Sequence, residues 1–449
     1  MRKPFYSNPF SPRLHAAILS AVLCLGIDLD AKTFRSTELG WTKGQGVTES
    51  FERFLSKGTF NSGDALRLEH TYRLAGNHLL PDNFTLTAAK NAGFEVTDAV
   101  EPKSNRALLE LGNGTTIRNL TIEYLNTPPL GPTGGKHGVH FTKRVGIEAR
   151  DKKGIRIENC RLTGSINHHL RLTDCTNVEV VGTHVAGGYW SIMLTGCDKL
   201  VFRHCMIEQC QGDGIKTGGG ASGAVRNVIV ENCVFQDCAR DGIDTTGGFN
   251  DSVIRNCIFR RLGVSGLDLK SHYESRTGRI EDLAPENIGI LVEKCVFHDM
   301  PNGLVITTLD CGRRKGPGHE LLNASNMKKY APHDIDINSC VFGHAEKPLR
   351  PASEGGYGVN YPSNKDGHMR MILLKDAYDV RYKDARFFGD RVTPVRVSSI
   401  GGSGHLSKEA AGAIAPGITG NVLDEPAPLI KPGVRKAPFV FGPQSTKGE

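Results

Sequence analysis

A short run of alternating aliphatic and polar residues recurs along this chain. Clear copies occupy residues 227–235, 252–259, 290–297 and 335–342, and each ends on a cysteine, an aliphatic residue and a phenylalanine. A period of two places every second side chain on the same face, which is typical of a β-strand with one buried face. The sequence therefore predicts many short strands and little helix.

A second type of strand, often with a glycine before its central aliphatic residue, recurs at intervals of about 25 residues. The aliphatic residues that define its register are Ile147, Leu170, Ile192, Ile215, Ile243, Leu267 and Leu304. Three short strands per interval, without helical periodicity, predict an all-β fold in which one chain winds as a parallel β-helix. We expect this β-helix to span residues 112–400.

Residues 32–111 are expected to form an N-terminal capping region, because the first coil of a solenoid would otherwise expose apolar strand. A short helix is predicted to begin at Thr48, whose hydroxyl suits a helix cap. Strands are predicted at residues 65–68, 72–74 and 84–87, between turn-forming residues.

The N-terminus has the pattern of an export signal. Arg2 and Lys3 precede an apolar run over residues 14–27, and the small residue Ala31 follows. This order predicts a signal peptide at residues 1–31 and a secreted or periplasmic protein; an uncleaved N-terminal anchor is the alternative. No other stretch is long and apolar enough to span a membrane.

The remaining segments add little chemistry. Long excursions are expected at residues 271–287 and 308–333, and the Gly/Pro-rich segment 401–449 is expected to pack on the β-helix as a tail. The 449 residues include 53 glycines and only 7% aromatics, which suits tight turns and an aliphatic interior. The net charge of +7 is compatible with an acidic partner or with solubility alone. We expect a monomer that does not bind nucleic acid.

The twelve cysteines follow the repeat. Six of them occupy one column of the register: Cys160, Cys205, Cys233, Cys257, Cys295 and Cys340. We expect a ladder of small apolar side chains inside the coil, with a disulfide such as Cys210–Cys238 as the alternative. A zinc site is not expected, because the chain has no pair of cysteines separated by two intervening residues.

Charged residues gather on three consecutive glycine-bearing strands. In register, Asp244 and Asp268 lie directly opposite each other, with Lys216 and Lys270 beside them. Like charges in this position repel, so the lysines neutralise them in a structural ladder or a cation binds between them. Asp213 and Asp241 add two more carboxylates on the same face. Converging oxygen ligands of this kind suit Ca²⁺.

Glycines accompany these charges. Gly214, Gly242 and Gly266 each precede the buried aliphatic residue of their strand. We expect them to form a floor without side chains, flanked by charged walls, along which a flexible polymer could lie close to the backbone.

The stretches 212–216, 240–244 and 265–270 resemble the family 9 pectate lyases. This resemblance implies a right-handed parallel β-helix, with Asp213, Asp241 and Asp244 as calcium ligands. We add Asp268 as a fourth candidate ligand. The chain departs from the family pattern in having Arg240 in place of an aspartate, and Asp268 at the position of the catalytic lysine.

The chemistry implied is β-elimination on a polymer that contains uronic acid. A cation neutralises the carboxylate beside the C5 proton, and a lysine removes that proton. Lys270 is our first candidate for the base and Lys216 the second. The residues that we expect to bind the acidic polysaccharide are Arg171, Arg240, His168, His169, Trp190 and Tyr273.

Three other functions fit parts of the pattern. An inverting hydrolase similar to the polygalacturonases would use Asp213 and Asp241, although Ser265 stands where its histidine would be. A uronan C5-epimerase begins with the same proton abstraction. A non-catalytic carbohydrate-binding β-helix would keep its function without either lysine.

Overall fold

The computed structural model describes most of the chain up to residue 308 and parts of the region beyond. The described residues are 31–57, 60–97, 107–128, 130, 142–218, 223–246, 248–271, 287–308, 332–343, 369–375, 380–388 and 392–398. The predicted signal peptide, apart from Ala31, the tail at 401–449 and most of the two excursions lie outside them. Those assignments therefore stay predictions.

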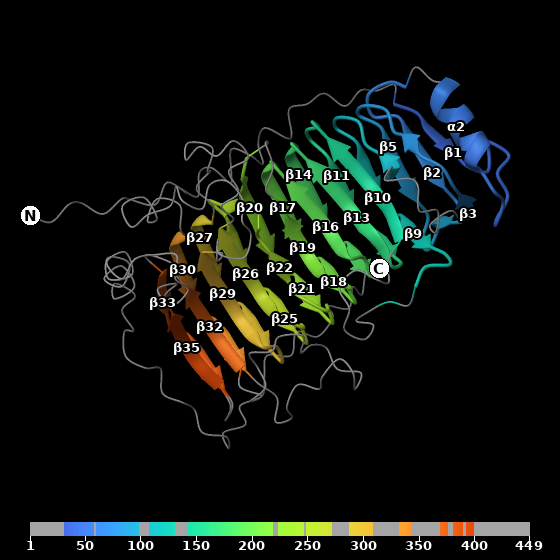
Figure 1. The fold of residues 1–449 in the computed structure, drawn as a ribbon. Coiled ribbons are helices and arrows are strands. Elements are labelled where there is room, and N and C mark those ends of the chain that lie inside the picture. The colour runs from blue at the N-terminus through green and yellow to red at the C-terminus, as the bar shows by residue number, and fades with distance from the viewer. Residues whose placement is uncertain are drawn as a thin grey trace, which may run out of the picture.

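The chain folds into three parallel sheets whose strands alternate along the sequence (Figure 1). Sheet A comprises β1 (Thr33–Arg35), β2 (Ala65–Leu68), β5 (Thr85–Ala88), β8 (Thr116–Arg118), β11 (Arg156–Glu158), β14 (Thr176–Val181), β17 (Asp198–Arg203), β20 (Val225–Glu231), β23 (Phe249–Asn250), β24 (Val253–Arg255), β27 (Ile288–Glu293), β30 (His333–Asn338) and β33 (Val380–Lys383).

Sheet B comprises β3 (Thr71–Leu74), β6 (Gly93–Val96), β9 (Thr121–Tyr124), β12 (Arg161–Thr163), β15 (His184–Ala186), β18 (Met206–Glu208), β21 (Val234–Gln236), β25 (Ile258–Arg260), β28 (Val296–His298), β31 (Val341–Gly343) and β34 (Arg386–Phe388). Sheet C comprises β4 (His78–Leu79), β7 (Ala107–Glu110), β10 (Thr142–Arg150), β13 (Ile166–Thr173), β16 (Trp190–Thr195), β19 (Asp213–Thr217), β22 (Ile243–Asp244), β26 (Ser265–Ser271), β29 (Asn302–Thr308), β32 (Met369–Lys375) and β35 (Val392–Ser398).

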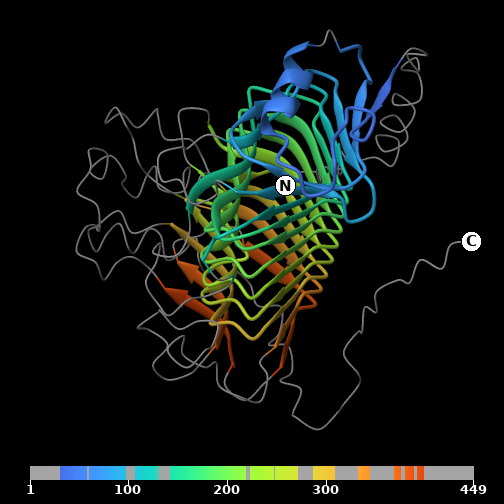
Figure 2. The ribbon, with the colours of Figure 1, turned by 90° about the vertical axis from the view of Figure 1, so that its right-hand side faces the viewer.

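A typical coil takes one strand from each sheet, as β17, β18 and β19 do, and the next coil repeats this order. The coils stack along one axis (Figure 2), so the predicted parallel β-helix is confirmed. The predicted register also holds: Ile215 pairs with Ile243, and Ile243 with Leu267. No helix in the described part of the chain is long and apolar enough to cross a membrane.

Ladders of identical side chains fill the interior. Phe235, Phe259, Phe297 and Phe342 stack with ring centroids 4.8–5.0 Å apart and ring planes within 8° of parallel. Each is fully buried. This separation follows the spacing of neighbouring parallel strands, so each coil repeats the packing of the previous one.

The cysteine ladder is present and reduced. Ten cysteines lie among the described residues, and all ten are buried free thiols. The alternative of a disulfide between Cys210 and Cys238 is therefore wrong. Within the ladder, the backbone N–H of Cys205 donates to Sγ of Cys233 at 3.4 Å. The thiols serve as small side chains that fit between the sheets.

The corner between sheets A and B explains the recurrent asparagines. Asn159, Asn232 and Asn256 have φ of 53°, 54° and 53°, in the left-handed region. Lys294 and Ser339 adopt the same conformation at the same corner of later coils. Asparagine tolerates this region better than most residues with a Cβ, so its recurrence reflects the backbone of the corner.

Helix α2 (Thr48–Lys57) covers the N-terminal end of the coils and buries Phe51 completely (Figure 1). The hydroxyl of Thr48 accepts a hydrogen bond from the N–H of Ala75, 3.0 Å away, and so ties the helix to a coil. The strands of this capping region are already members of the three sheets.

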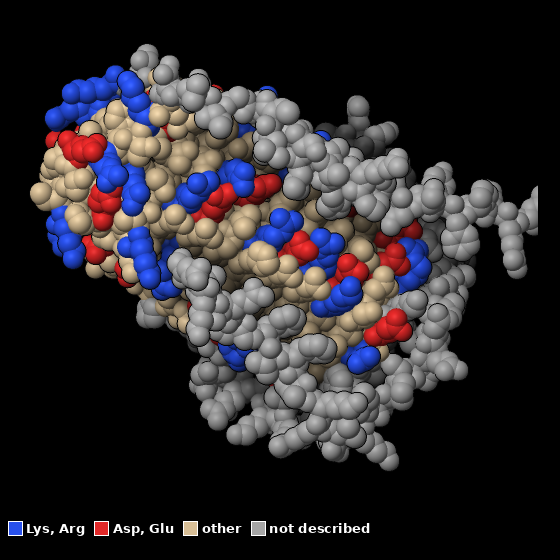
Figure 3. Space-filling view, turned by 180° about the vertical axis from the view of Figure 1, so that it is seen from behind, with Lys and Arg blue, Asp and Glu red and all other residues tan. Residues whose placement is uncertain are grey.

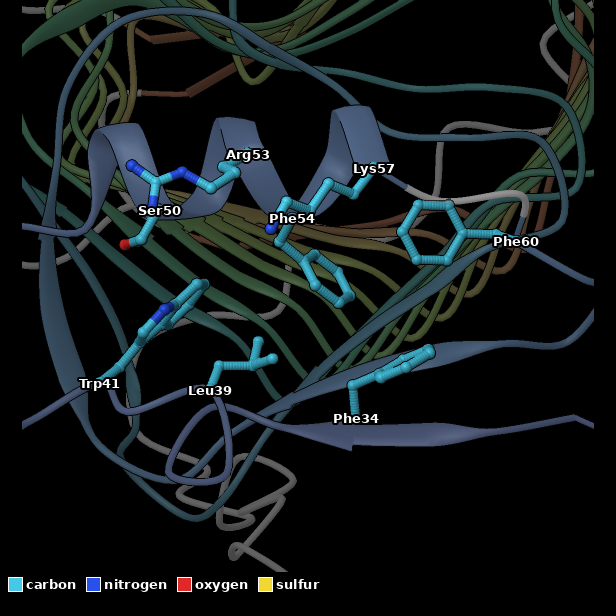
Figure 4. Close-up of a pocket in the computed structure, with 8 residues that line it drawn as sticks. All are labelled: Phe34, Leu39, Trp41, Ser50, Arg53, Phe54, Lys57 and Phe60. Carbon is cyan, nitrogen blue, oxygen red and sulfur yellow. The ribbon is translucent and has the colours of Figure 1, made fainter.

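A pocket of about 410 Å³ opens beside this helix (Figure 4). Its lining residues are Phe34, Leu39, Trp41, Ser50, Arg53, Phe54, Lys57 and Phe60. It belongs to the end cap, whereas the charged residues singled out in the sequence lie on sheet C.

Candidate active site

Three adjacent strands of sheet C, β19, β22 and β26, bring the predicted charged residues together. Lys216 pairs in register with Asp244, and Asp244 pairs with Asp268. Asp244 and Asp268 therefore lie opposite each other on neighbouring strands, as the sequence predicted. We call Asp213, Lys216, Arg240, Asp241, Asp244, Asp268 and Lys270 the charged cluster.

A local break in the strand alternation brings Asp213 to the same side as Lys216. The N–H of Gly214 donates to O of Asp241 and the N–H of Ile215 to O of Gly242, both at 2.9 Å. Two consecutive amides thus bond to the same neighbouring strand, which a regular strand does not do. Gly214 and Ile215 both face the interior, and the residues on either side of them meet at the cluster.

The prediction of a glycine floor is wrong. A Cβ on Gly242 would lie 2.7 Å from Cδ1 of Phe259, and one on Gly266 would lie 2.5 Å from Cδ1 of Phe297. The missing side chains therefore point into the phenylalanine ladder, away from any groove. Glycine stands here because the interior has no room for a further carbon.

Both lysines contact Asp244 on strand β22, which lies between their own strands β19 and β26, and Lys270 also contacts Asp268 on its own strand. Nζ of Lys216 donates to Oδ2 of Asp244 and, at 2.6 Å, to Oγ1 of Thr246. Nζ of Lys270 lies 2.5 Å from Oδ2 of Asp268 and 3.3 Å from Oδ1 of Asp244. Asp244 is thus shared between both ammonium groups.

Arg240 lies among the other carboxylates. Its Nε is 3.5 Å from Oδ1 of Asp213, and its Nη2 is 4.0 Å from Oδ2 of Asp241 and 3.9 Å from Oδ2 of Asp244. The guanidinium therefore approaches three carboxylates at similar distances. The position that the resemblance assigns to an aspartate is occupied by the opposite charge.

Burial differs among the members of the cluster. The side chains of Asp213, Asp241 and Asp244 have no exposed surface, whereas that of Arg240 is 24% exposed. Lys216 and Lys270 each keep 12% of their side-chain surface exposed, and Asp268 keeps 9%. A ligand that approaches the cluster therefore meets the three cations and Asp268, while the other three carboxylates are covered.

The buried carboxyls differ in their protonation. Burial raises the pKa of Asp213 to about 7, against the attraction of Arg240. Burial also raises the pKa of Asp241 to about 6, and the nearby charge of Asp268 acts in the same direction. For Asp244, burial works to raise the pKa, but Lys270 and Lys216 outweigh it and hold the pKa at about 2. Asp213 and Asp241 are therefore expected to change protonation state at pH values near neutral.

The environment of Lys270 raises its pKa, whereas a lysine that acts as a general base needs a lowered pKa. Burial works to lower its pKa, but the charges of Asp268 and Asp244 outweigh burial and hold the pKa well above the usual range. A base must lose its proton near the working pH. The contacts of Lys270 therefore favour a permanent cation.

Two hydroxyl residues complete the cluster without having been singled out in the sequence. Thr246 donates to Oδ1 of Asp244 at 2.9 Å while it accepts from Lys216, and Ser265 donates to Oδ1 of Asp241. The register was the signal for both, since Ser265 begins strand β26 and Thr246 follows strand β22 by two residues. Three carboxylate oxygens still lack a hydrogen bond: Oδ2 of Asp213, Oδ2 of Asp241 and Oδ1 of Asp268.

Aromatic residues border the cluster on the preceding coils. Nζ of Lys216 lies 5.8 Å from the centroid of the Trp190 ring. Trp190 stacks on His168 with ring centroids 5.9 Å apart, and His168 donates from Nδ1 to O of Trp190 at 2.8 Å. The ring of Tyr189 also lies next to that of Trp190, with the two ring centroids 5.0 Å apart.

The other predicted substrate-binding residues lie in different surroundings. His169 is fully buried and donates from Nε2 to O of Gly164 at 2.9 Å, so its side chain belongs to the interior. Arg171 forms a two-point ion pair with Glu148 on the preceding coil, both bonds 2.8 Å long. Tyr273 lies outside the described residues.

Stacked charges elsewhere on the coils occur both as opposite and as like pairs. In sheet A, Glu231 lies between Arg203, 3.0 Å away, and Arg255, 2.8 Å away. Glu110 lies opposite Glu148 in sheet C, and Glu95 lies opposite Glu123 in sheet B. Figure 3 shows basic and acidic side chains interspersed over the face opposite to that of Figure 1. Like charges in register are destabilising unless a cation compensates them, and Lys270 does so between Asp244 and Asp268.

Calcium fits the donor set but not the neighbouring charges. Oxygens of Asp213, Asp241 and Asp244 all lie within 4.8 Å of one another, which is compatible with one cation. Arg240 and Lys216, however, already direct positive charge at these carboxylates. As the side chains lie, a divalent ion would have to displace them.

Comparison with known proteins supports the fold. Residues 106–277 match the family model described as "right handed beta helix region". No curated protein matches the chain by sequence. The polygalacturonase from Erwinia carotovora ssp. carotovora superposes with a TM-score of 0.53 at 14% identity, over 84% of this chain and 99% of the enzyme.

Two further solved structures give the same result. A surface adhesin of Streptococcus pneumoniae superposes with a TM-score of 0.56 at 11% identity, over 82% of this chain and 93% of the adhesin. The family 28 exopolygalacturonase of Yersinia enterocolitica gives 0.53 at 11% identity, over 82% and 78%. The fold is a right-handed parallel β-helix. At such identities the likeness defines architecture, and enzymes and an adhesin share it.

Proposed function

We propose that this protein is an enzyme that cleaves a uronic-acid-containing polysaccharide by β-elimination at the charged cluster. The observation that carries the proposal is that Arg240, Lys216 and Lys270, all partly exposed, lie together with four carboxylates on adjacent coils, so that one lysine can act as the base while the other two cations bind the uronate carboxylate. The resemblance of the same strands to family 9 pectate lyases supports it.

The substrate class follows from what this surface offers. Guanidinium and ammonium groups bind carboxylates, and a guanidinium does so in a planar, two-point geometry. Trp190 lies beside Lys216 and offers an aromatic face to a sugar ring. A sugar that carries a carboxylate satisfies both features, whereas a neutral sugar leaves the cations unused.

The reaction requires one proton to leave and one to arrive. A base takes the proton from C5 of the uronate, a double bond forms between C4 and C5, and the C4–O bond to the leaving sugar breaks. The leaving oxygen then takes up a proton. Cations near the uronate carboxylate stabilise the negative charge that develops next to it.

We assign the base to Lys216 and the stabilising cations to Arg240 and Lys270. Lys270 is the weaker candidate for the base, because its carboxylate partners hold its pKa high. Lys216 Nζ lies 3.9 Å from Oδ2 of Asp213, and the raised pKa of Asp213, about 7, makes this carboxylate a better proton acceptor than an ordinary aspartate. No step of this scheme uses a metal ion.

A second candidate, hydrolysis of the glycosidic bond, is favoured by the raised pKa values of Asp213 and Asp241. Glycoside hydrolases use a protonated carboxyl as acid and a second carboxyl as base or nucleophile. Both residues lie on adjacent coils, and the N–H of Asp241 donates to Oδ1 of Asp213 at 3.2 Å. Their complete burial beneath Arg240 is the reason for placing this candidate second.

One assay separates the reactions. The protein is incubated with polygalacturonate, alginate or glucuronan, with calcium or with a chelator, and unsaturated uronide and reducing ends are both measured. Ultraviolet absorbance of the unsaturated product supports the lyase. Reducing ends without that absorbance indicate the hydrolase, and a changed uronate ratio without cleavage indicates an epimerase. Binding without any chemical change would indicate a carbohydrate-binding protein.

A further inference from the structure

We infer that the guanidinium of Arg240 takes the place of a divalent cation at Asp213, Asp241 and Asp244. The charge that would hold these three carboxylates together is then part of the chain. The inference concerns ion binding alone and stands whether or not the proposed reaction is correct.

The three carboxylates have the geometry of a cation site. They come from two adjacent coils, and one oxygen of each lies within 4.8 Å of the others. All three side chains are fully buried, so an uncompensated set would be strongly repulsive. Lys216 and Lys270 contact Asp244, and Lys216 is 3.9 Å from Asp213, so a further positive charge is needed above all for Asp213 and Asp241.

Arg240 supplies that charge from a central position. Its nitrogens lie 3.5, 3.9 and 4.0 Å from oxygens of the three carboxylates. These distances are similar to one another and longer than those of a two-point ion pair. By contrast, Nε and Nη2 of Arg261 lie 2.6 and 2.7 Å from the two oxygens of Asp237, in a two-point ion pair. Arg240 therefore relates to the group of acids as a central ion does.

The backbone holds Arg240 at this place. Its N–H donates to O of Gly212 on the preceding coil, and its own carbonyl accepts from the N–H of Val264 on the following coil, both at 3.1 Å. The residue is thus fixed between two coils at the start of strand β22. A guanidinium carries its charge at all physiological pH values, so the charge is permanent as well as fixed in position.

If Arg240 were absent, several carboxylate oxygens would be available to a metal ion. Oδ2 of Asp213 and Oδ2 of Asp241 are buried and make no hydrogen bond. Removing the guanidinium would vacate the space beside Oδ1 of Asp213, Oδ2 of Asp241 and Oδ2 of Asp244, and such hard oxygen donors suit Ca²⁺. Arg261, which pairs at two points with Asp237, provides a matched control for the loss of a guanidinium.

The test is calcium titration by calorimetry on purified wild-type protein, Arg240→Ala, Arg240→Lys and the matched control Arg261→Ala. We expect Arg240→Ala to gain one calcium site per chain, with affinity at least about tenfold above any binding by the other three proteins. Arg240→Lys retains a cation at the site and is expected to remain without calcium. No substrate is present, so this result is separate from that of the activity assay.

Two results would overturn the inference. One is a saturable calcium site in the wild type that disappears in Asp213→Asn. The other is a folded Arg240→Ala protein, with a cooperative thermal transition, that binds calcium no better than the wild type. If Arg240→Ala folds only when calcium is added, that rescue supports the inference; if it does not fold at all, the wild-type and Asp213→Asn titrations decide.

Discussion

Nζ of Lys270 lies 2.5 Å from Oδ2 of Asp268, the residue two positions earlier on strand β26. It also lies 3.3 Å from Asp244 on the neighbouring strand β22. One ammonium group thus bridges two carboxylates that face each other on neighbouring strands. This bridge lets Asp244 and Asp268 occupy opposing positions, and it gives Lys270 a structural role independent of catalysis.

Replacement of Lys270 by alanine is expected to lower the free energy of unfolding by about 3 kcal/mol, because it leaves buried carboxylates without their partner. Urea unfolding followed by circular dichroism measures the loss. Arg118→Ala is the control, since Arg118 is 49% exposed and pairs with Glu158 at the surface. That change should reduce stability by less than about 1 kcal/mol. Equal losses in the two variants would show that the Lys270 bridge is not stabilising.

The raised pKa of Asp213 predicts a pH-dependent contribution to stability. The folded-state pKa is about 7, whereas an unfolded aspartate has a pKa of about 3.9. Between these values the folded state binds more protons, so the contribution of Asp213 falls as pH rises from about 4 to about 7 and is constant above. The stability of wild type minus that of Asp213→Asn should follow this slope.

The difference between the two proteins is the necessary measurement. Burial lowers the pKa of His168 and of His169 to about 4, from an ordinary value of about 6.5. Their contribution therefore rises between about pH 4 and 6.5 and opposes that of Asp213. Both histidines are present in each protein, so they cancel in the difference. A difference that stays constant from pH 4 to 8 would contradict the raised pKa.

The glycine before each buried aliphatic residue predicts a packing defect on substitution. Gly242→Ala places a Cβ 2.7 Å from both O of Gly266 and Cδ1 of Phe259. We expect a loss of about 1–3 kcal/mol in the free energy of unfolding from this overpacking. Gly46→Ala is the control, because no atom lies within 4 Å of its added Cβ. A Gly242→Ala protein as stable as the control would mean that the coil spacing adjusts freely.

The cysteine ladder predicts chemical inertness. The ten described cysteines are buried, and burial raises the pKa of Cys160 to about 12. For Cys257, burial works to raise the pKa, but hydrogen bonds from neighbouring thiols outweigh it and lower the pKa, and such a bond also lowers the pKa of Cys175. Because the packed interior keeps a thiol reagent away from every one of them, the reagent should leave all ten unlabelled in the native protein. Mass spectrometry after labelling, with and without denaturant, measures this. Labelling of any of them under native conditions at the same rate as in denaturant would contradict the packing.

Much of the architecture is readable from the sequence because the β-helix repeats its packing. Ile215, Ile243 and Leu267 mark the coils by their spacing, and the pairing of Asp244 with Asp268 follows from that register. The same register also placed Lys216 and Lys270 in one cluster.

What the sequence could not give is the direction and the neighbours of individual side chains. Strict alternation does not predict that Gly214 and Ile215 both face inward, since that depends on the hydrogen bonds to the next coil. Strict alternation also fails to predict the interior position of His169. The place of Arg240 among three carboxylates depends on where its side chain runs, which the register leaves open.

The most direct test of the central claim compares wild type, Lys216→Ala and Arg118→Ala for release of unsaturated uronide from polyuronates. We predict that the wild type and Arg118→Ala form the product, and that Lys216→Ala loses about 100-fold or more of the rate, as expected for removal of a general base. All three proteins must show the same cooperative unfolding. Absence of product from every polyuronate, or full activity in a folded Lys216→Ala protein, would contradict the assignment of the charged cluster as a lyase active site.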